Sequence, residues 1–273
     1  MSLSLPQELL DLIVDHLRDE RATLNACCTV SKSWVPRARR HLFFRVDFIP
    51  ESSIASWMKA FPDPSSSPAR YARVLSLNGL SSLALASTFV RSFRYIVELQ
   101  VTSVWWSRGQ HPSLVPLHGL SPTLKSLYVY GSFIPLLELL NLIYSFPLLE
   151  DLRLYLVSAK SATETEGWDA PSTPAKLTGS LRLRGEIRSV TRRLLSLPNG
   201  LHFAKIEMMC LVEDVGLVTD LVSRCSGTLE SLYIGSFFLG AFSFGFCSWL
   251  ASYSYSWTQA HPQCHLQSTS PKS

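Results

Sequence analysis

The chain has 273 residues, enough for one large domain or for a small module and a larger one, and 47% of them are hydrophobic, which is ample for a core. Charged residues make up 17%, and the formal net charge of +4 is not concentrated in a dense basic stripe, which argues against a nucleic-acid-binding protein. Six cysteines without a Cys-x-x-Cys pair argue against a disulfide scaffold and favour a reducing compartment, the cytoplasm or the nucleus.

The N-terminal segment, residues 3–46, predicts three short helices. Pro6 suits the first turn of a helix, and Leu9, Ile13 and Leu17 recur at four-residue spacing, so they share one face. Helices this short cannot bury all of their apolar side chains. We therefore expect part of this apolar surface to meet a partner.

Residues 47–70 are predicted as a linker, and a repeated pattern follows over residues 71–237. Seven segments fit an apolar-x-x-apolar-x-apolar template at spacings of 24 to 29 residues. Their central apolar pairs are Leu75/Leu77, Leu99/Val101, Leu127/Val129, Leu152/Leu154, Leu181/Leu183, Ile206/Met208 and Leu232/Ile234. This period is typical of leucine-rich repeats, whose strand–helix units stack into a curved solenoid.

Two features bear on this interpretation. The Asn or Cys that normally follows the motif is absent from all seven copies, so the repeats are expected to be irregular. Residues 159–176, rich in Ser, Thr, Ala and Pro, are predicted as a loop inserted into one repeat. An ordinary α/β domain whose strands are similar by chance stays open as the alternative.

The C-terminal tail, residues 238–273, is atypical because no charged residue occurs between Glu230 and Lys272. The uncharged run 232–250 is long enough to cross a bilayer. Glycines and serines dilute the run, however, and no basic flank follows it, so a membrane span is the weaker interpretation.

No motif in the sequence indicates catalysis. There is no Gly-x-Ser-x-Gly elbow, phosphate-binding Gly-rich loop or His-Glu-x-x-His helix, so neither an enzyme nor a cofactor is predicted. Cys247, His261, Cys264 and His265 are of metal-ligand type, but their spacing matches no standard zinc arrangement. We therefore predict no metal site.

The N-terminal segment resembles an F-box. The match runs from Leu5-Pro6 through Ile13 to Val30-Ser31-Lys32-Ser33-Trp34 and on to His41-Leu42-Phe43. With the repeats that follow, the chain resembles the F-box/leucine-rich-repeat proteins, especially those of fungi. The resemblance implies an α/β repeat fold, with an N-terminal three-helix F-box module followed by an irregular leucine-rich-repeat solenoid.

The same resemblance implies a function. Such a chain is a non-catalytic substrate-recognition adaptor of a Skp–cullin–F-box ubiquitin ligase: the F-box docks on a Skp-family adaptor, which leads to a cullin, and the repeats bind a protein substrate. The residues assigned to adaptor docking are Leu5, Pro6, Leu9, Leu10, Ile13, Leu17, Val30 and Trp34. Three alternatives stay open. These residues could instead pack against the first repeat. The chain could be an interaction scaffold that recruits no ligase, or it could be anchored in a membrane by its C-terminal run.

Substrate contacts are expected at strand positions that alternate with the buried ones. The candidates are Tyr128, Arg153, Tyr155, Arg182, Arg184 and Tyr233. This mixture of basic and aromatic side chains favours an acidic or phosphorylated ligand.

Overall fold

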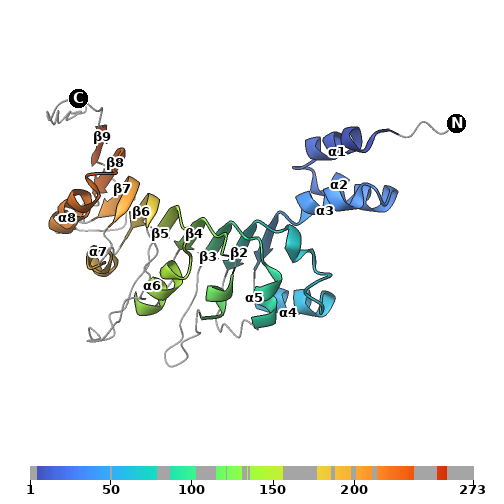
Figure 1. The fold of residues 1–273 in the computed structure, drawn as a ribbon, viewed down its shortest axis with the longest axis horizontal. Helices are drawn as coiled ribbons and strands as arrows, with labels where there is room; N and C mark the ends of the chain where they lie inside the picture. Colours follow the sequence, from blue (N-terminus) through green and yellow to red (C-terminus); the bar gives the residue numbers. More distant parts are fainter. Residues whose placement is uncertain are drawn as a thin grey trace, which may run out of the picture. The chain divides into compact units, whose positions relative to one another are not determined.

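The computed structural model describes residues 5–49, 51–78, 87–102, 115–120, 122–130, 134, 136–155, 177–185, 188–197, 201–210, 214–236 and 251–256. The chain divides into two compact units, Met1–Leu124 and Lys125–Ser273. Each unit contains strands with helices packed against them (Figure 1).

The strands of the described residues form one sheet in chain order, β1 to β9, in which β1 to β8 are parallel and β9 is antiparallel to β8. The predicted three-helix F-box module followed by an irregular leucine-rich-repeat solenoid is therefore wrong: the chain is an α/β fold with a single parallel sheet. Parallel strands need crossover connections of about a dozen residues or more, and regular crossovers produce strand spacings that resemble a repeat. The α/β domain left open by the sequence is the class that fits.

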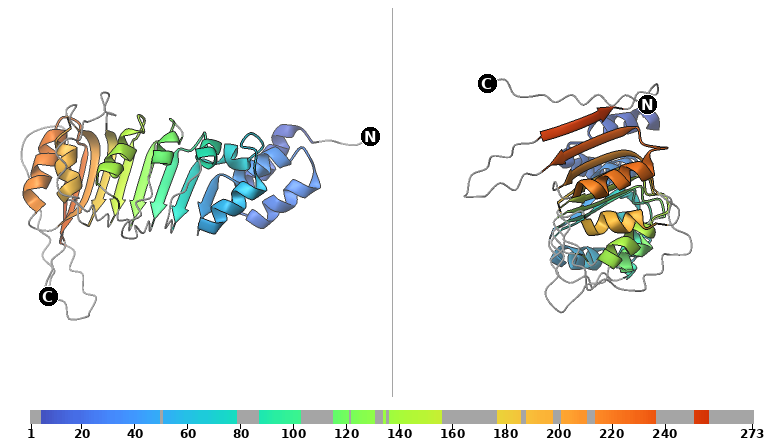
Figure 2. Two further views of the ribbon diagram at one scale, coloured as in Figure 1. Left: turned by 90° about the horizontal axis from the view of Figure 1, so that it is seen from below. Right: turned by 90° about the vertical axis from the view of Figure 1, so that its left-hand side faces the viewer.

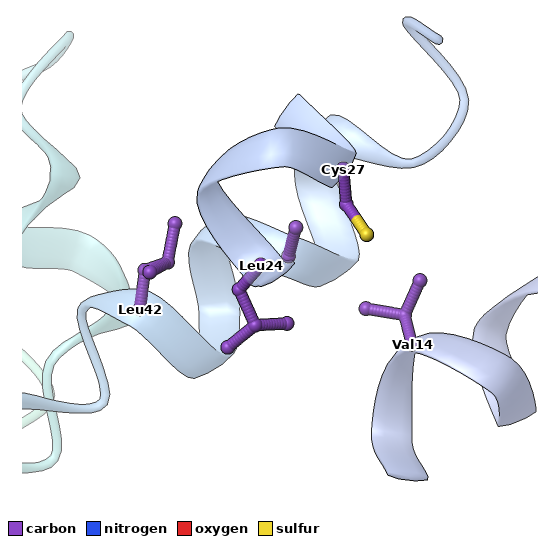
Figure 3. Packing of buried hydrophobic residues seen from close by; sticks show 5 residues of the cluster. Val14, Leu24, Cys27 and Leu42 are labelled. Atoms are coloured by element: carbon purple, nitrogen blue, oxygen red, sulfur yellow. The ribbon is translucent and has the colours of Figure 1, made fainter. Parts of the chain in front are cut away.

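Three helices open the first unit: α1 (Gln7–His16), α2 (Arg21–Val30) and α3 (Val35–Leu42). They enclose a small core formed by Val14, Leu24, Cys27, Ala38 and Leu42. In Figure 3, Val14 of α1 points toward Leu24 and Cys27 of α2. Each helix thus turns apolar side chains inward. In α1 these are Val14 and Leu17, whereas Leu9 and Ile13, which the four-residue spacing placed on the same face as Leu17, are exposed.

An ion-pair cluster centred on Asp15 joins α1 to α3. The Asp15 carboxylate accepts two hydrogen bonds from the Arg37 guanidinium, and His41 Nε2 lies 2.7 Å from Asp15 Oδ1. The hydrogen bonds from Arg37, and then from His41, hold the pKa of Asp15 well below its usual range. The negative charge of Asp15 is therefore favoured in the folded state.

The remaining elements of the first unit are β1 (Arg45–Phe48), α4 (Glu51–Ala60), η1 (Pro68–Tyr71), β2 (Val74–Asn78), α5 (Ser87–Ser92), β3 (Glu98–Thr102) and η2 (Val115–Gly119). Phe48 of β1 makes edge-on ring contacts with Trp57 of α4 and Phe89 of α5. These contacts fix both helices on one face of the strands. The stretch predicted as a linker, 47–70, therefore contains helix α4 and part of η1.

The second unit contains β4 (Ser126–Tyr130), α6 (Leu136–Tyr144), β5 (Asp151–Tyr155), β6 (Thr178–Arg184), α7 (Arg188–Leu195), β7 (His202–Cys210), α8 (Val215–Cys225), β8 (Ser231–Ser236) and β9 (Ala251–Ser256). Helices α6, α7 and α8 lie on the same face of its strands (Figures 1 and 2). The apolar residues that alternate along the strands, such as Leu127 and Leu183, are buried on that face. Strands form at all seven predicted positions, as β2 to β8.

Gly179 lies at the start of β6, where the pairing with β7 is irregular. Its φ of 77° lies in the left-handed region, and the pairing of β6 with β7 shifts register between Gly179 and Ser180. A Cβ atom at Gly179 would lie 2.1 Å from the backbone oxygen of Glu150, which accepts a hydrogen bond from the Ser180 N–H at 2.7 Å. Glycine is therefore required where β6 approaches the chain before β5.

Several sequence predictions fall on residues outside the described ranges. The predicted inserted loop, 159–176, lies entirely outside them, and of the predicted tail, 238–273, only β9 (Ala251–Ser256) is described. The uncharged run 232–250 is described as far as residue 236, where it forms part of β8. In the portion of the chain that the structure describes, no helix combines the length and the apolarity needed to cross a bilayer.

Candidate functional site

Helix α1 has one face in the core and another in water. Val14 is 1% exposed, whereas Leu12 and Ile13 beside it in the sequence are 55% and 43% exposed. Leu9, one turn before Ile13, is exposed as well, and so is Leu5 just before the helix. We call Leu5, Leu9, Leu12 and Ile13 the α1 ridge.

The residues predicted to dock on an adaptor separate into two groups. Those exposed are Leu5, Pro6, Leu9, Ile13 and Val30, and those partly buried are Leu10, Leu17 and Trp34. Leu17 and Trp34 pack against the core of the three helices. Trp34→Ala would therefore damage the helical packing itself, whereas substitutions in the α1 ridge change exposed side chains.

Leu12 is exposed but was not among the predicted docking residues. It lies three residues after Leu9, and residues spaced by three or four are neighbours on a helix surface. That spacing was visible in the sequence. Leu12 was not predicted because the F-box pattern includes Ile13 and does not include Leu12.

The α1 ridge can bind an apolar partner surface. Burying a leucine or isoleucine side chain fully contributes about 1.5–3 kcal/mol. Groups of exposed apolar side chains on soluble proteins commonly mark interaction sites. Three such side chains within two turns of one helix supply enough apolar surface to anchor α1 in a hydrophobic groove of a partner.

A second candidate surface lies on the strands of the second unit, on the face turned away from α6, α7 and α8. The strand register places its side chains in three rows that cross β4 to β8. These rows are Ser126, Asp151, Ser180, Lys205 and Ser231; then Tyr128, Arg153, Arg182, Glu207 and Tyr233; then Tyr130, Tyr155, Arg184, Met209 and Gly235. We call these three rows the polar face.

Carboxylates hold the arginines of the polar face in place. Arg153 Nε donates to Asp151 Oδ2 at 2.8 Å on the same strand. Glu207 receives two arginines, because Arg184 donates to its Oε1 and Arg182 Nε lies 3.5 Å from its Oε2. The hydrogen bond to Glu207 also raises the pKa of the Arg184 guanidinium, which stays charged throughout the physiological range.

Tyrosine rings lie next to these cations. The rings of Tyr128 and Tyr155 meet edge-on with centroids 5.3 Å apart, and the Arg184 guanidinium lies 5.0 Å from the centroid of Tyr155. Burial raises the pKa of the Tyr128 hydroxyl above its ordinary value, so the phenol stays neutral and able to donate a hydrogen bond at neutral pH.

The structure therefore brings the predicted substrate residues onto one face. Tyr128, Arg153, Tyr155, Arg182 and Arg184 lie on adjacent strands, and Tyr233 joins them through the row that contains Glu207. Glu207 itself was missed. It stands between the buried Ile206 and Met208 as Arg153 stands between Leu152 and Leu154, and this position was its available signal.

Within the described residues, no group of three His, Cys, Asp or Glu side chains is placed to hold a metal ion. The four metal-ligand-type residues weighed in the sequence, Cys247, His261, Cys264 and His265, lie outside those residues.

Comparisons of the chain with family models, with curated proteins and with solved structures found no match in any of the three.

Proposed function

We propose that this chain is a non-catalytic substrate-recognition subunit of a Skp–cullin–F-box ubiquitin ligase. In this proposal the α1 ridge docks on a Skp-family adaptor, and through it on a cullin. The polar face binds a protein substrate. The chain supplies proximity, and the ubiquitin-transfer chemistry belongs to its partners.

The observation that carries the proposal is the exposure of the α1 ridge. Val14 of the same helix is buried in the core, so α1 is already held in place without Leu9, Leu12 and Ile13. Exposing apolar side chains on a helix that is otherwise packed has a cost in solubility, which a docking role explains. The F-box resemblance, found in the sequence, falls on the same stretch.

Affinity purification of the full-length chain, followed by mass spectrometry, tests the proposal. The wild-type chain is expected to recover a Skp-family adaptor and a cullin. Leu9→Asp combined with Ile13→Asp should abolish both, because two charges placed in a buried apolar contact would be desolvated without partners. Leu137→Asp is the matched control, since Leu137 is an exposed leucine on helix α6 in the other unit.

Two results would overturn the proposal. One is recovery of the adaptor by the Leu9→Asp, Ile13→Asp variant at the wild-type level. The other is reproducible recovery of interacting proteins by the wild-type chain without any Skp-family adaptor, which would favour an interaction scaffold that recruits no ligase.

A further inference from the structure

In the polar face one carboxylate, that of Glu207 on β7, contacts two arginines of β6, Arg182 and Arg184. We propose that this face binds an extended, carboxylate-rich segment of a protein, and that Glu207 occupies the place that an acidic side chain of this segment takes in the complex. The inference rests on the proposed function, in that the segment belongs to the substrate delivered to the ligase.

The geometry around Glu207 supports an exchangeable contact. The side chains of Arg182 and Arg184 are 38% and 44% exposed, while that of Glu207 is 23% exposed, so both guanidinium groups remain accessible to a ligand. Each guanidinium has five N–H donors, more than the two oxygens of Glu207 can accept. An incoming carboxylate can therefore bind either arginine in the manner that Glu207 already shows.

The charges of the polar face favour an acidic occupant. Its three rows contain four cationic side chains, Arg153, Arg182, Arg184 and Lys205, and two carboxylates, Asp151 and Glu207. The excess of positive charge attracts anionic segments and speeds their association. The contacts made by Glu207 and Asp151 show that carboxylate groups fit these guanidiniums, so carboxylates are taken as the ligand chemistry, and phosphate is an outcome that the test below distinguishes.

The tyrosines define the shape of the surface. Tyr128 and Tyr155 form an aromatic patch beside Arg184, and neutral phenol groups can donate hydrogen bonds to carboxylates or backbone carbonyls. Strands lie about 4.8 Å apart, so β4 to β8 span about 19 Å, which an extended segment of about six residues covers. A short, linear, acidic segment matches this surface.

Fluorescence anisotropy of the full-length chain tests the inference. The probe is a labelled octapeptide that alternates Glu and Gly, with a Gln-for-Glu peptide and a phosphoserine-for-Glu peptide for comparison. Wild-type chain should bind the Glu peptide, with affinity that falls as salt increases. The Gln peptide should bind at least about tenfold more weakly, because charge-assisted hydrogen bonds are lost.

Two variants show whether the ligand displaces the Glu207 carboxylate from the arginines or whether Glu207 only holds the arginines in place. Glu207→Gln should tighten binding of the Glu peptide by about threefold or more, because the internal competitor is removed. Arg182→Gln combined with Arg184→Gln should weaken it by at least about tenfold. Arg192→Gln is the matched control, since Arg192 is an exposed arginine on α7, on the helix-bearing face, and should leave binding unchanged.

The opposite outcomes would overturn the inference. These are unchanged or weaker binding by Glu207→Gln, equal binding of the Gln peptide, or a phosphoserine peptide that binds more than about tenfold tighter than the Glu peptide. If the double arginine variant fails to fold, the affinity of the Glu207→Gln variant for the Glu peptide still tests the inference. The Leu9→Asp, Ile13→Asp variant should bind the Glu peptide normally, so failure of the adaptor proposal and failure of this inference give different results.

Discussion

Asp15 illustrates how a single side chain can hold two helices together. Its carboxylate on α1 accepts hydrogen bonds from Arg37 and lies beside His41, both on α3. Because Arg37 presents two N–H groups to one carboxylate, the pair fixes the direction of both side chains. The α1 ridge is thereby held on a helix whose position is defined by both packing and charge.

Asp15→Asn should destabilise the protein by about 1–2 kcal/mol near pH 7, a modest amount because water screens this partly exposed cluster. The pKa of Asp15 is lowered in the folded state. The stabilisation from Asp15 is therefore fully present above its unfolded-state pKa of about 3.9 and is lost as the pH falls toward the folded-state value. Urea unfolding at pH 7 and at successively lower pH measures this effect.

The control for this prediction is Asp19→Asn, which removes an exposed carboxylate whose ion pair is with the neighbouring Arg18. Its free energy of unfolding should match that of the wild type at pH 7. If Asp15→Asn retained the same loss of stability on acidification as the wild-type chain, the role assigned to Asp15 would be wrong.

Gly179 should tolerate no side chain. Gly179→Ala places a Cβ atom 2.1 Å from the Glu150 backbone oxygen and requires a non-glycine residue at a φ of 77°. We expect a loss of about 3 kcal/mol or more in the free energy of unfolding, measured by urea denaturation. Gly216→Ala is the control, because nothing lies within 4 Å of its Cβ position in α8 and the change should be neutral or slightly stabilising.

At the scale of the element, helix α1 has a buried face that contains Val14 and an exposed face that contains Leu12. Val14→Ala should cost about 2 kcal/mol of stability, because it removes buried methyl groups from the three-helix core. Leu12→Ala should leave stability within about 0.5 kcal/mol of the wild type, because Leu12 is exposed. Thermal unfolding of the two variants compares these effects, and equal losses would show that Leu12 is a core residue.

The strands could be predicted from the sequence because their signal is local. Pairs such as Leu127 and Val129 must both face the helices, and alternation over five residues is sufficient to show that. The polar candidates between the buried residues followed from the same alternation. This is why six residues far apart in the sequence were correctly predicted to lie on strands.

Other elements could not be found in this way. Strand β1 (Arg45–Phe48) has two buried residues, Val46 and Phe48, which is too short a pattern to separate from the end of the F-box match. The pairing of Glu207 with Arg182 and Arg184 depends on the register of β6 against β7. That register shifts between Gly179 and Ser180, and no sequence pattern reports the shift.

At the scale of the whole molecule, the predicted fold class was wrong because it rested on the regular spacing of the strands along the sequence, which does not report how the strands are arranged in space. Crossovers of similar length produce a regular period whether the units form a curved solenoid or one parallel sheet. The F-box match also suggested a separate helical module. In the structure, α1 to α3 belong to the same compact unit as β1 to β3, and the sheet begins three residues after α3.

The two candidate surfaces belong to different compact units, the α1 ridge to the first and the polar face to the second. Substitutions in one are expected to leave binding at the other unchanged, because each surface is built from the residues of its own unit. Measuring the affinity of the Glu peptide with and without saturating adaptor checks this independence. A change of more than about threefold would show that the two surfaces are coupled.

The central claim is that the α1 ridge binds a Skp-family adaptor. Calorimetric titration of the purified adaptor into the full-length chain tests it most directly. We predict saturable binding with one adaptor per chain and a negative heat-capacity change, the mark of apolar burial, reduced at least about tenfold by Leu9→Asp with Ile13→Asp and unchanged by Leu137→Asp. Absence of saturable binding by the wild-type chain, or equal affinity in the double variant, would contradict the claim.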